Sequence, residues 1–212
     1  MPNEILANIL WQLRDFMALY EFKPLPEWNQ YRRSVGNGFQ CLILSATSYS
    51  EGTMLEAHIG MRHDQVESLV FPLLNGRPGF EANSMTLVTP LSRLFEADTS
   101  RYWLTSAEEE QQALEQIKQQ LVQRGFSLLR QLQTLKALDE LFNAHPMQPL
   151  KMVHNQQHRC FRGLVIARLN QRPDFFELAG MYRNQLYRLG AQAREMEQFE
   201  RLTSFLHTYS AN

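Results

Sequence analysis

The tripeptide Gly36-Asn37-Gly38 restricts the fold more than any other feature of the sequence, because it separates two stretches rich in strand-forming residues. The stretches are 31–35 and 39–48. A Gly-Asn pair in such a place is typical of a two-residue type I′ turn, in which both central residues have positive φ. We therefore predict an antiparallel hairpin here. A third strand is predicted at 53–62, where apolar and polar residues alternate.

The remaining predicted elements separate into an N-terminal part with both strands and helices and a C-terminal part with helices alone. Strands are predicted at 84–89 and 101–104, and helices at 5–20 and 64–74. From Ser106 onward only helical patterns occur, at 106–131, 134–142, 158–169, 173–189 and 192–209. This segregation predicts an α+β fold: an antiparallel four- or five-stranded sheet covered by the first two helices, followed by a C-terminal helical segment. We expect an α+β domain over 1–132 with 133–212 packed on it, and one continuous domain is the alternative.

Boundary residues support several of these helices. Asp64 and Ser106 are predicted N-caps, and each has a glutamate three residues later. That spacing is typical of a capping box. Pro72 is expected to shorten or kink its helix, and Gly125 to interrupt the long one.

Composition excludes some functional classes. The chain has 21 Lys and Arg against 22 Asp and Glu, which disfavours a strongly basic nucleic-acid binder and an acidic mimic. Its 2 cysteines are too few for a disulfide framework or a four-thiolate zinc site, so Cys41 and Cys160 are predicted to be reduced thiols in the core. The sequence contains no apolar run of about 20 residues and no basic signal-peptide start, so a cytoplasmic location without membrane association is expected.

The sequence carries few signs of catalysis. The sequence contains no Walker lysine, HExxH, GxSxG or CxxC motif, and Gly36-Asn37-Gly38 joins two strands rather than a strand and a helix. His154 and His158, with Cys160 nearby, are the nearest approach to a metal site, but we predict neither a metal nor a cofactor.

His58 is the best candidate for an enzyme site. It lies on the wetter face of the predicted strand 53–62, which it shares with Glu56, and Arg62 ends that strand. A histidine beside a carboxylate can perform acid–base chemistry. The sequence supplies no nucleophile or oxyanion donor beside it, so an exposed or partner-facing His58 is the preferred interpretation.

Arginine is the most frequent charged residue in the C-terminal helical part of the chain. Between 151 and 194 there are eight cationic residues against two acidic ones, whereas 96–115 holds six acidic residues against one arginine. The two segments are expected to attract each other or to form solvated faces. A second hypothesis makes Arg159, Arg162, Arg168 and Arg172 a patch for an acidic protein, which would require that they be exposed and unpaired.

Three features resemble a layout found in uncharacterised bacterial families of cytoplasmic α+β proteins, known only as domains of unknown function. The features are Trp103-Leu104-Thr105, the acidic helix start that leads to Leu128-Leu129-Arg130, and Leu135-x-x-Leu138-x-x-Leu141-Phe142. Some such proteins are similar to immunity proteins that neutralise toxins. The order of elements also resembles that of type III secretion chaperones, from which the helical tail after Gln131 departs.

From these observations we expect a non-enzymatic protein-binding module of immunity or adaptor type. The alternatives are a secretion-chaperone-like protein and an enzyme with a scattered site around His58. The expected partner is another protein, or a second copy of the chain if the last helix exposes its apolar stripe, and nucleic acid is disfavoured.

Overall fold

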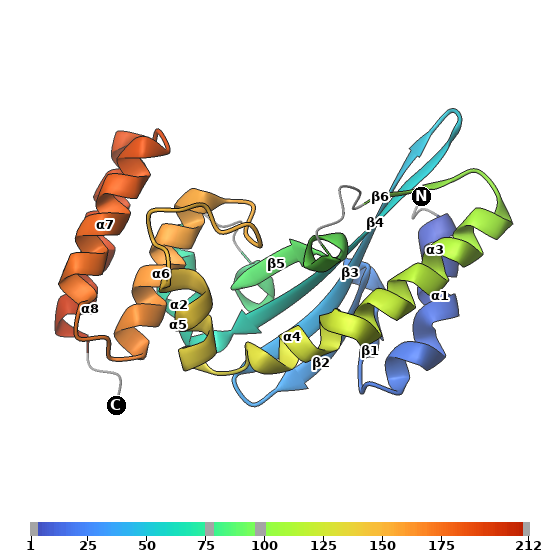
Figure 1. The fold of residues 1–212 in the computed structure, drawn as a ribbon, viewed down its shortest axis with the longest axis horizontal. Coiled ribbons are helices and arrows are strands. Elements are labelled where there is room, and N and C mark those ends of the chain that lie inside the picture. The colour runs from blue at the N-terminus through green and yellow to red at the C-terminus, as the bar shows by residue number, and fades with distance from the viewer. Residues whose placement is uncertain (1–3, 75–78, 96–100, 210–212) are drawn as a thin grey trace. The chain divides into compact units, whose positions relative to one another are not determined.

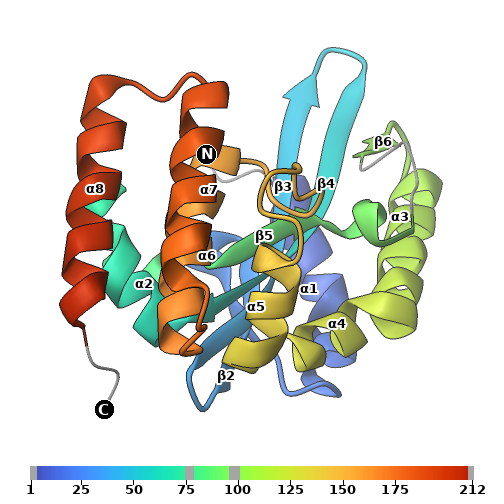
Figure 2. The same ribbon diagram turned by 60° about the vertical axis from the view of Figure 1, so that its left-hand side comes forward.

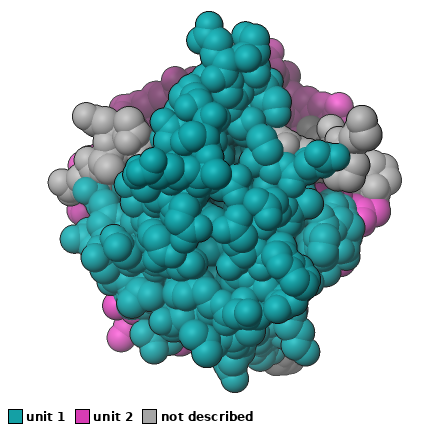
Figure 3. Space-filling view, turned by 90° about the vertical axis from the view of Figure 1, so that its right-hand side faces the viewer, with its two compact units in different colours: residues 1–61, 87–130 teal, residues 62–86, 131–212 magenta. Residues whose placement is uncertain are grey.

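The computed structural model describes residues 4–74, 79–95 and 101–209 and has the predicted α+β fold (Figure 1). Most of the predicted loop at 75–79 and the acidic residues Glu96 and Asp98 lie outside the described residues. The chain forms two compact units, which Figure 3 distinguishes by colour. Unit 1 contains residues 1–61 and 87–130, and unit 2 contains residues 62–86 and 131–212.

The antiparallel sheet has six strands, in the order β1-β2-β3-β4-β5 with β6 also paired to β4. Their bounds are β1 Lys23–Leu25, β2 Gln30–Val35, β3 Gly38–Tyr49, β4 Gly52–His63, β5 Leu87–Pro90 and β6 Arg101–Leu104. Sequence patterns predicted every strand except β1, whose three residues include Pro24. Proline has no N–H to donate to a neighbouring strand, so a strand that contains it is found at the edge of a sheet. The same proline makes the strand difficult to predict from sequence.

The predicted hairpin is present, but the predicted turn type is wrong. β2 and β3 pair antiparallel from Val35↔Gly38 to Gln30↔Ile43, so Gly36 and Asn37 form a two-residue connection. Neither has a positive φ. The positive φ falls instead on Gly38, at 146°, which excludes a type I′ turn.

Helices cover one face of the sheet in unit 1. They are α1 (Glu4–Ala18), α3 (Ala107–Gln120) and α4 (Phe126–Gln131), with a π-helical turn at Leu121–Gly125 between the last two. The π-helical turn ends at Gly125, where an interruption was predicted. Phe126 packs against aromatic side chains that follow or end α1, with its ring centroid 4.1 Å from that of Tyr20. Glu110 of α3 accepts hydrogen bonds from Asn8 and Gln12 of α1, at 2.7 and 2.6 Å.

Unit 2 is helical and is organised around α6 (Gln156–Leu169). Around it lie α2 (Asp64–Val70), α5 (Leu135–Asn143), α7 (Phe175–Arg188) and α8 (Ala193–Thr208). Figure 2 shows α7 and α8 as an antiparallel pair. α6 is buried on most sides, as expected for a helix with helical neighbours on several faces. α2, which the sequence pattern assigns to the sheet, packs on α6 in this unit, and it ends before Pro72 as predicted.

Both cysteines are free and buried, which confirms their predicted state. Cys41 lies in β3 and Cys160 in α6. Among the described helices, none combines the length and the apolar character needed to cross a bilayer.

Candidate functional site

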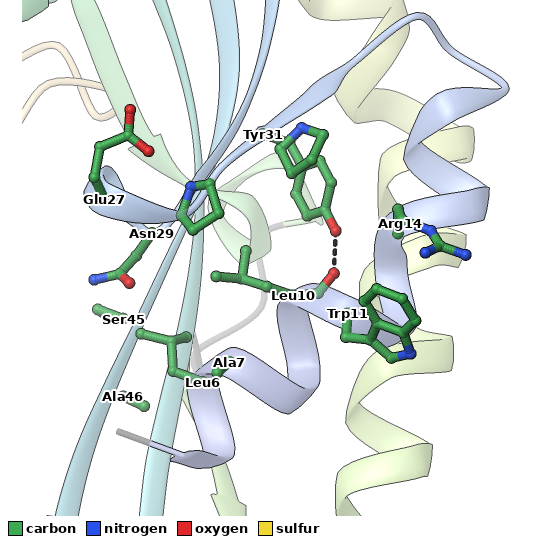
Figure 4. A pocket seen from close by; sticks show the side chains of 12 residues that line it. Leu6, Ala7, Leu10, Trp11, Arg14, Glu27, Asn29, Tyr31, Ser45 and Ala46 are labelled. Carbon is green, nitrogen blue, oxygen red and sulfur yellow. Dashed lines mark hydrogen bonds between the residues drawn. The ribbon is translucent and has the colours of Figure 1, made fainter. Parts of the chain in front are cut away.

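A groove in unit 1 lies between α1 and the sheet (Figure 4). Its volume is about 930 Å³. α1 contributes Leu6, Ala7, Leu10, Trp11 and Arg14; the segment 24–31 contributes Pro24, Pro26, Glu27, Asn29 and Tyr31; and β3 contributes Ser45 and Ala46. Most of these side chains are apolar, so the groove is suited to an apolar surface with a few polar contacts.

Helical spacing explains what α1 presents to the groove. Ala7, Trp11 and Arg14 are separated by four and three residues, so they lie along one helix face. The guanidinium carbon of Arg14 lies 4.1 Å from the centroid of the Trp11 ring, and Arg14 Nε is 2.9 Å from Asp15 Oδ1. The hydrogen bond to Asp15 raises the pKa of Arg14. Trp11 is nevertheless 66% exposed, so a large aromatic face is held in place beside the groove.

Tyr31 connects the two sides of the groove at its base. Its side chain is fully buried, and its hydroxyl donates a hydrogen bond to the carbonyl oxygen of Leu10, within α1 (Figure 4). Burial raises the pKa of Tyr31 to about 12, so the phenol stays protonated and remains a donor even at mildly alkaline pH. This contact fixes α1 against β2.

Backbone groups of β3 also face the groove. The last hydrogen bond from β3 toward the β2 side joins the Leu44 amide to the Asn29 carbonyl, at 3.0 Å. β3 continues to Tyr49, and Figures 1 and 2 show the β3–β4 hairpin projecting past β2. Because backbone groups alternate in direction along a strand, the N–H and C=O of Ala46 point the same way as those of Leu44, toward the groove. Within the described residues β3 pairs only with β2 and β4, so no described strand pairs with β3 at Ala46 on this side.

All three tryptophans of the chain are exposed and belong to unit 1. Trp11 is 66%, Trp28 39% and Trp103 46% exposed. Trp28 directly follows two residues that line the groove. Tryptophan is enriched at the energetic centres of protein interfaces, and its exposure in the isolated chain favours a binding face.

A second hollow of about 480 Å³ lies between the β3–β4 turn and the start of α3. The rings of Tyr49 and Trp103 lie 5.4 Å apart beside it. Ser106 caps α3 as predicted, accepting from the Glu109 amide at 3.2 Å. Glu109 itself accepts hydrogen bonds from the Thr105 side chain and backbone, which lower its pKa.

The four candidate arginines do not form an exposed, unpaired patch. Arg159 is 3% exposed and donates to three backbone carbonyls, those of Phe142, His145 and Gln148. Arg162 makes two hydrogen bonds to the carboxylate of Glu67, at 2.8 and 3.0 Å.

The other two arginines are also held within unit 2. Arg168 donates to the carbonyls of His207 and Tyr209, where a cation complements the C-terminal end of α8. Arg172 pairs with Asp174 at 2.6 Å and with Asp139 at 3.3 Å. The carboxylates that pair with Arg162 and Arg172 therefore belong to unit 2, and none of them comes from the described part of the acidic segment, residues 101–115.

Glu67 belongs to a buried polar cluster that the sequence did not reveal. Burial opposes its ionisation, but the charge and hydrogen bonds of Arg162, with further hydrogen bonds from Thr86 and Ser84, keep its pKa below the usual value. Ser84 and Thr86 were predicted to begin the strand that starts instead at Leu87, and their hydroxyls serve this cluster. The cluster satisfies its own charges, which indicates a structural role.

His58 is half-buried in β4, in a pair with Pro90 of β5. The carboxylate of its neighbour Glu56 is engaged by Arg101, with Nε and Oε1 3.0 Å apart. Neither of the hollows described above is lined by His58. Over residues 4–74, 79–95 and 101–209, no group of three or more His, Cys, Asp or Glu side chains is arranged to hold a metal ion.

Sequence reasoning missed the groove. One signal was present: Trp11 falls off the apolar stripe of α1, on a face that also carries Asn8, Arg14 and Asp15. A tryptophan in that position is not buried in the core and is therefore available for binding. Comparisons with protein-family models, with curated proteins and with solved structures found no match to this chain.

Proposed function

We propose that this protein binds another protein through the α1 groove. The observation that carries the proposal is Trp11, which is held by Arg14 at the rim of an apolar groove while two thirds of its surface is exposed. A buried aromatic anchor surrounded by polar contacts is the usual energetic centre of a protein interface. The immunity-type and adaptor roles are two uses of such a binding face.

Site-specific cross-linking tests the proposal. The photoreactive residue benzoylphenylalanine, placed at position 11 in the full chain, should form a discrete protein adduct in lysate of the source organism. Leu19 is a matched control position, because it follows the same helix and is 80% exposed but does not line the groove. Adducts of equal yield from both positions, or none from position 11, would contradict the proposal.

A substitution supplies the energetic test. Trp11→Ala should weaken binding of the cross-linked partner by at least about 2 kcal/mol, the cost typical of an interface hot spot. Its free energy of unfolding should change little, because Trp11 is exposed. Trp103→Ala is the control, since Trp103 is also exposed on unit 1 and does not line the groove. Equal losses from both variants would show that the groove is not the binding face.

A further inference from the structure

The open edge of β3 indicates what kind of segment occupies the groove. β2 begins at Gln30, so the part of β3 after Leu44 extends beyond it, and the Ala46 N–H and C=O face the space between α1 and the segment 24–31. A helix would leave these backbone groups without strand partners. An extended segment would hydrogen-bond to them as β2 does to the earlier part of β3.

The outer edge of β1 and the edge of β3 at Ala46 differ in their chemistry. β1 reads Lys23-Pro24-Leu25, and both a proline and a lysine discourage another strand from pairing with it. Residues 45–49 of β3 are Ser-Ala-Thr-Ser-Tyr, with no proline and no charge. Natural sheets normally protect an edge with such residues, so an edge without proline or charge beside an apolar groove favours a site for strand addition.

Charge adds a requirement for the occupant. Two ionised side chains line the groove, and Arg14 is already paired with Asp15. Glu27 has no ion-pair partner among the residues that the structure describes. A cation on the incoming segment would complement Glu27 and sharpen the choice of partner.

We propose that the occupant is an extended segment of the partner protein that pairs with β3 at Ala46, places apolar side chains against Leu6, Leu10 and Trp11, and carries a Lys or Arg opposite Glu27. This inference rests on the proposed function and specifies its partner. The edge beside residues 45–47 accommodates about three residues, at roughly 3.3 Å each. Alternate side chains of the segment face α1, and the others face away.

Peptides selected from a phage-displayed library of ten-residue sequences on the immobilised full chain provide the probe. The selected peptides should alternate apolar with other residues and be enriched in Lys or Arg at one end. On binding, hydrogen exchange of the Ala46 amide should slow by at least about tenfold. The Ser45 amide faces β4 and should not change. Selection of helical sequences, or an unchanged Ala46 amide, would overturn the inference.

N-methylated peptides test the backbone pairing without altering the protein. Methylating the alternate amides that face β3 should reduce affinity at least about tenfold, because each methyl group removes a donor and adds bulk. Methylating the amides on the other side, with identical side chains, is the matched control. Equal effects from the two peptides would exclude strand addition. Glu27→Gln should weaken binding severalfold and reduce its dependence on salt.

Peptide binding and cross-linking at position 11 together distinguish failure of the strand-addition inference from failure of the proposed function. If no peptide binds, or if the bound peptides are helical, while position 11 still cross-links to a protein, the strand-addition inference fails and the proposed function stands. If neither assay detects binding, both fail. A concentration-dependent dimer of the chain alone that protects Ala46 would make a second copy the occupant and overturn the inference.

Discussion

Arg162 of α6 donates hydrogen bonds from Nε and from a terminal nitrogen to the carboxylate of Glu67 of α2, which is 95 residues away in sequence. Glu67 is completely buried, and the Arg162 side chain is only 13% exposed. A buried charge without its partner is costly, so this pair controls how α2 is held on α6.

Arg162→Met should therefore destabilise the protein by about 3–5 kcal/mol, because it leaves the Glu67 carboxylate buried without a counter-charge. Chemical denaturation measures the change. Arg201→Ala is the control: Arg201 pairs with Glu197 on the surface at 2.6 Å, and its removal should cost less than about 1 kcal/mol. Adding Glu67→Gln to Arg162→Met should recover part of the loss, and a fully additive double variant would contradict this account.

Stability should fall as the pH is lowered below neutrality, through His63. Its side chain is 2% exposed, and its buried Nδ1 has no hydrogen-bond partner among the described residues. Burial lowers the pKa of His63, while the nearby charge of Asp64 partly opposes the shift. The unfolded chain therefore binds a proton near pH 6.5 that the folded chain does not, so stability is complete above about pH 6.5 and is lost as the pH falls toward the folded pKa.

The free energy of unfolding of wild type and His63→Asn, measured between pH 7.5 and 5, checks this prediction. The variant should show a smaller loss over that range, since one group contributes at most about 1.4 kcal/mol per pH unit. His158 contributes with the same sign, because burial and the charge of Arg162 lower its pKa. The variant that combines His63→Asn with His158→Asn should be flatter still. An unchanged slope in His63→Asn would refute the assignment.

Two glycines on packed helices should respond oppositely to alanine. At Gly163 of α6 a methyl group would meet the Tyr182 side chain and would lie 2.7 Å from Asn143 Oδ1. These two residues hydrogen-bond to each other and to the end of α5, so they have little room to move. Gly163→Ala should cost about 1–3 kcal/mol.

Gly180 of α7 is the counterpart, because no atom lies within 4 Å of a methyl group there. Gly180→Ala should stabilise the protein by about 0.5–1 kcal/mol, since alanine loses less backbone entropy in a helix interior. Thermal and chemical denaturation of both variants test the pair. Destabilisation by Gly180→Ala would show that packing around α7 differs from that described.

Both cysteines should resist thiol reagents in the folded chain. Cys41 and Cys160 are at most 1% exposed, and burial raises the pKa of each to about 12, which suppresses the reactive thiolate. Ellman's reagent at pH 8 should titrate no thiol in native protein and two per chain in denaturant. Ser45→Cys, on the exposed edge of β3, should add one rapidly reacting thiol. Rapid reaction of the unmodified native chain would contradict the burial of both side chains.

The sequence alone determined the class of fold and the position of most elements. The alternation at 53–62, the glycines around Asn37 and the cap at Ser106 act through residues close in the chain, so each could be predicted from the local sequence. It could not reveal β1, because Pro24 disguises a short edge strand. It also misassigned the turn type, because Gly38 rather than Gly36 or Asn37 adopts the positive φ.

Tertiary structure decided which charges are free and where a groove exists. From the sequence alone, Arg162 and Arg168 are expected to be surface cations. In the folded chain Glu67 pairs with Arg162, and the end of α8 accepts hydrogen bonds from Arg168. The groove needs α1, residues 24–31 and β3 together, with Tyr31 bonded to Leu10. Periodicity reports which face of an element is apolar, but the partners of a side chain depend on contacts between segments far apart in sequence, which only the folded chain specifies.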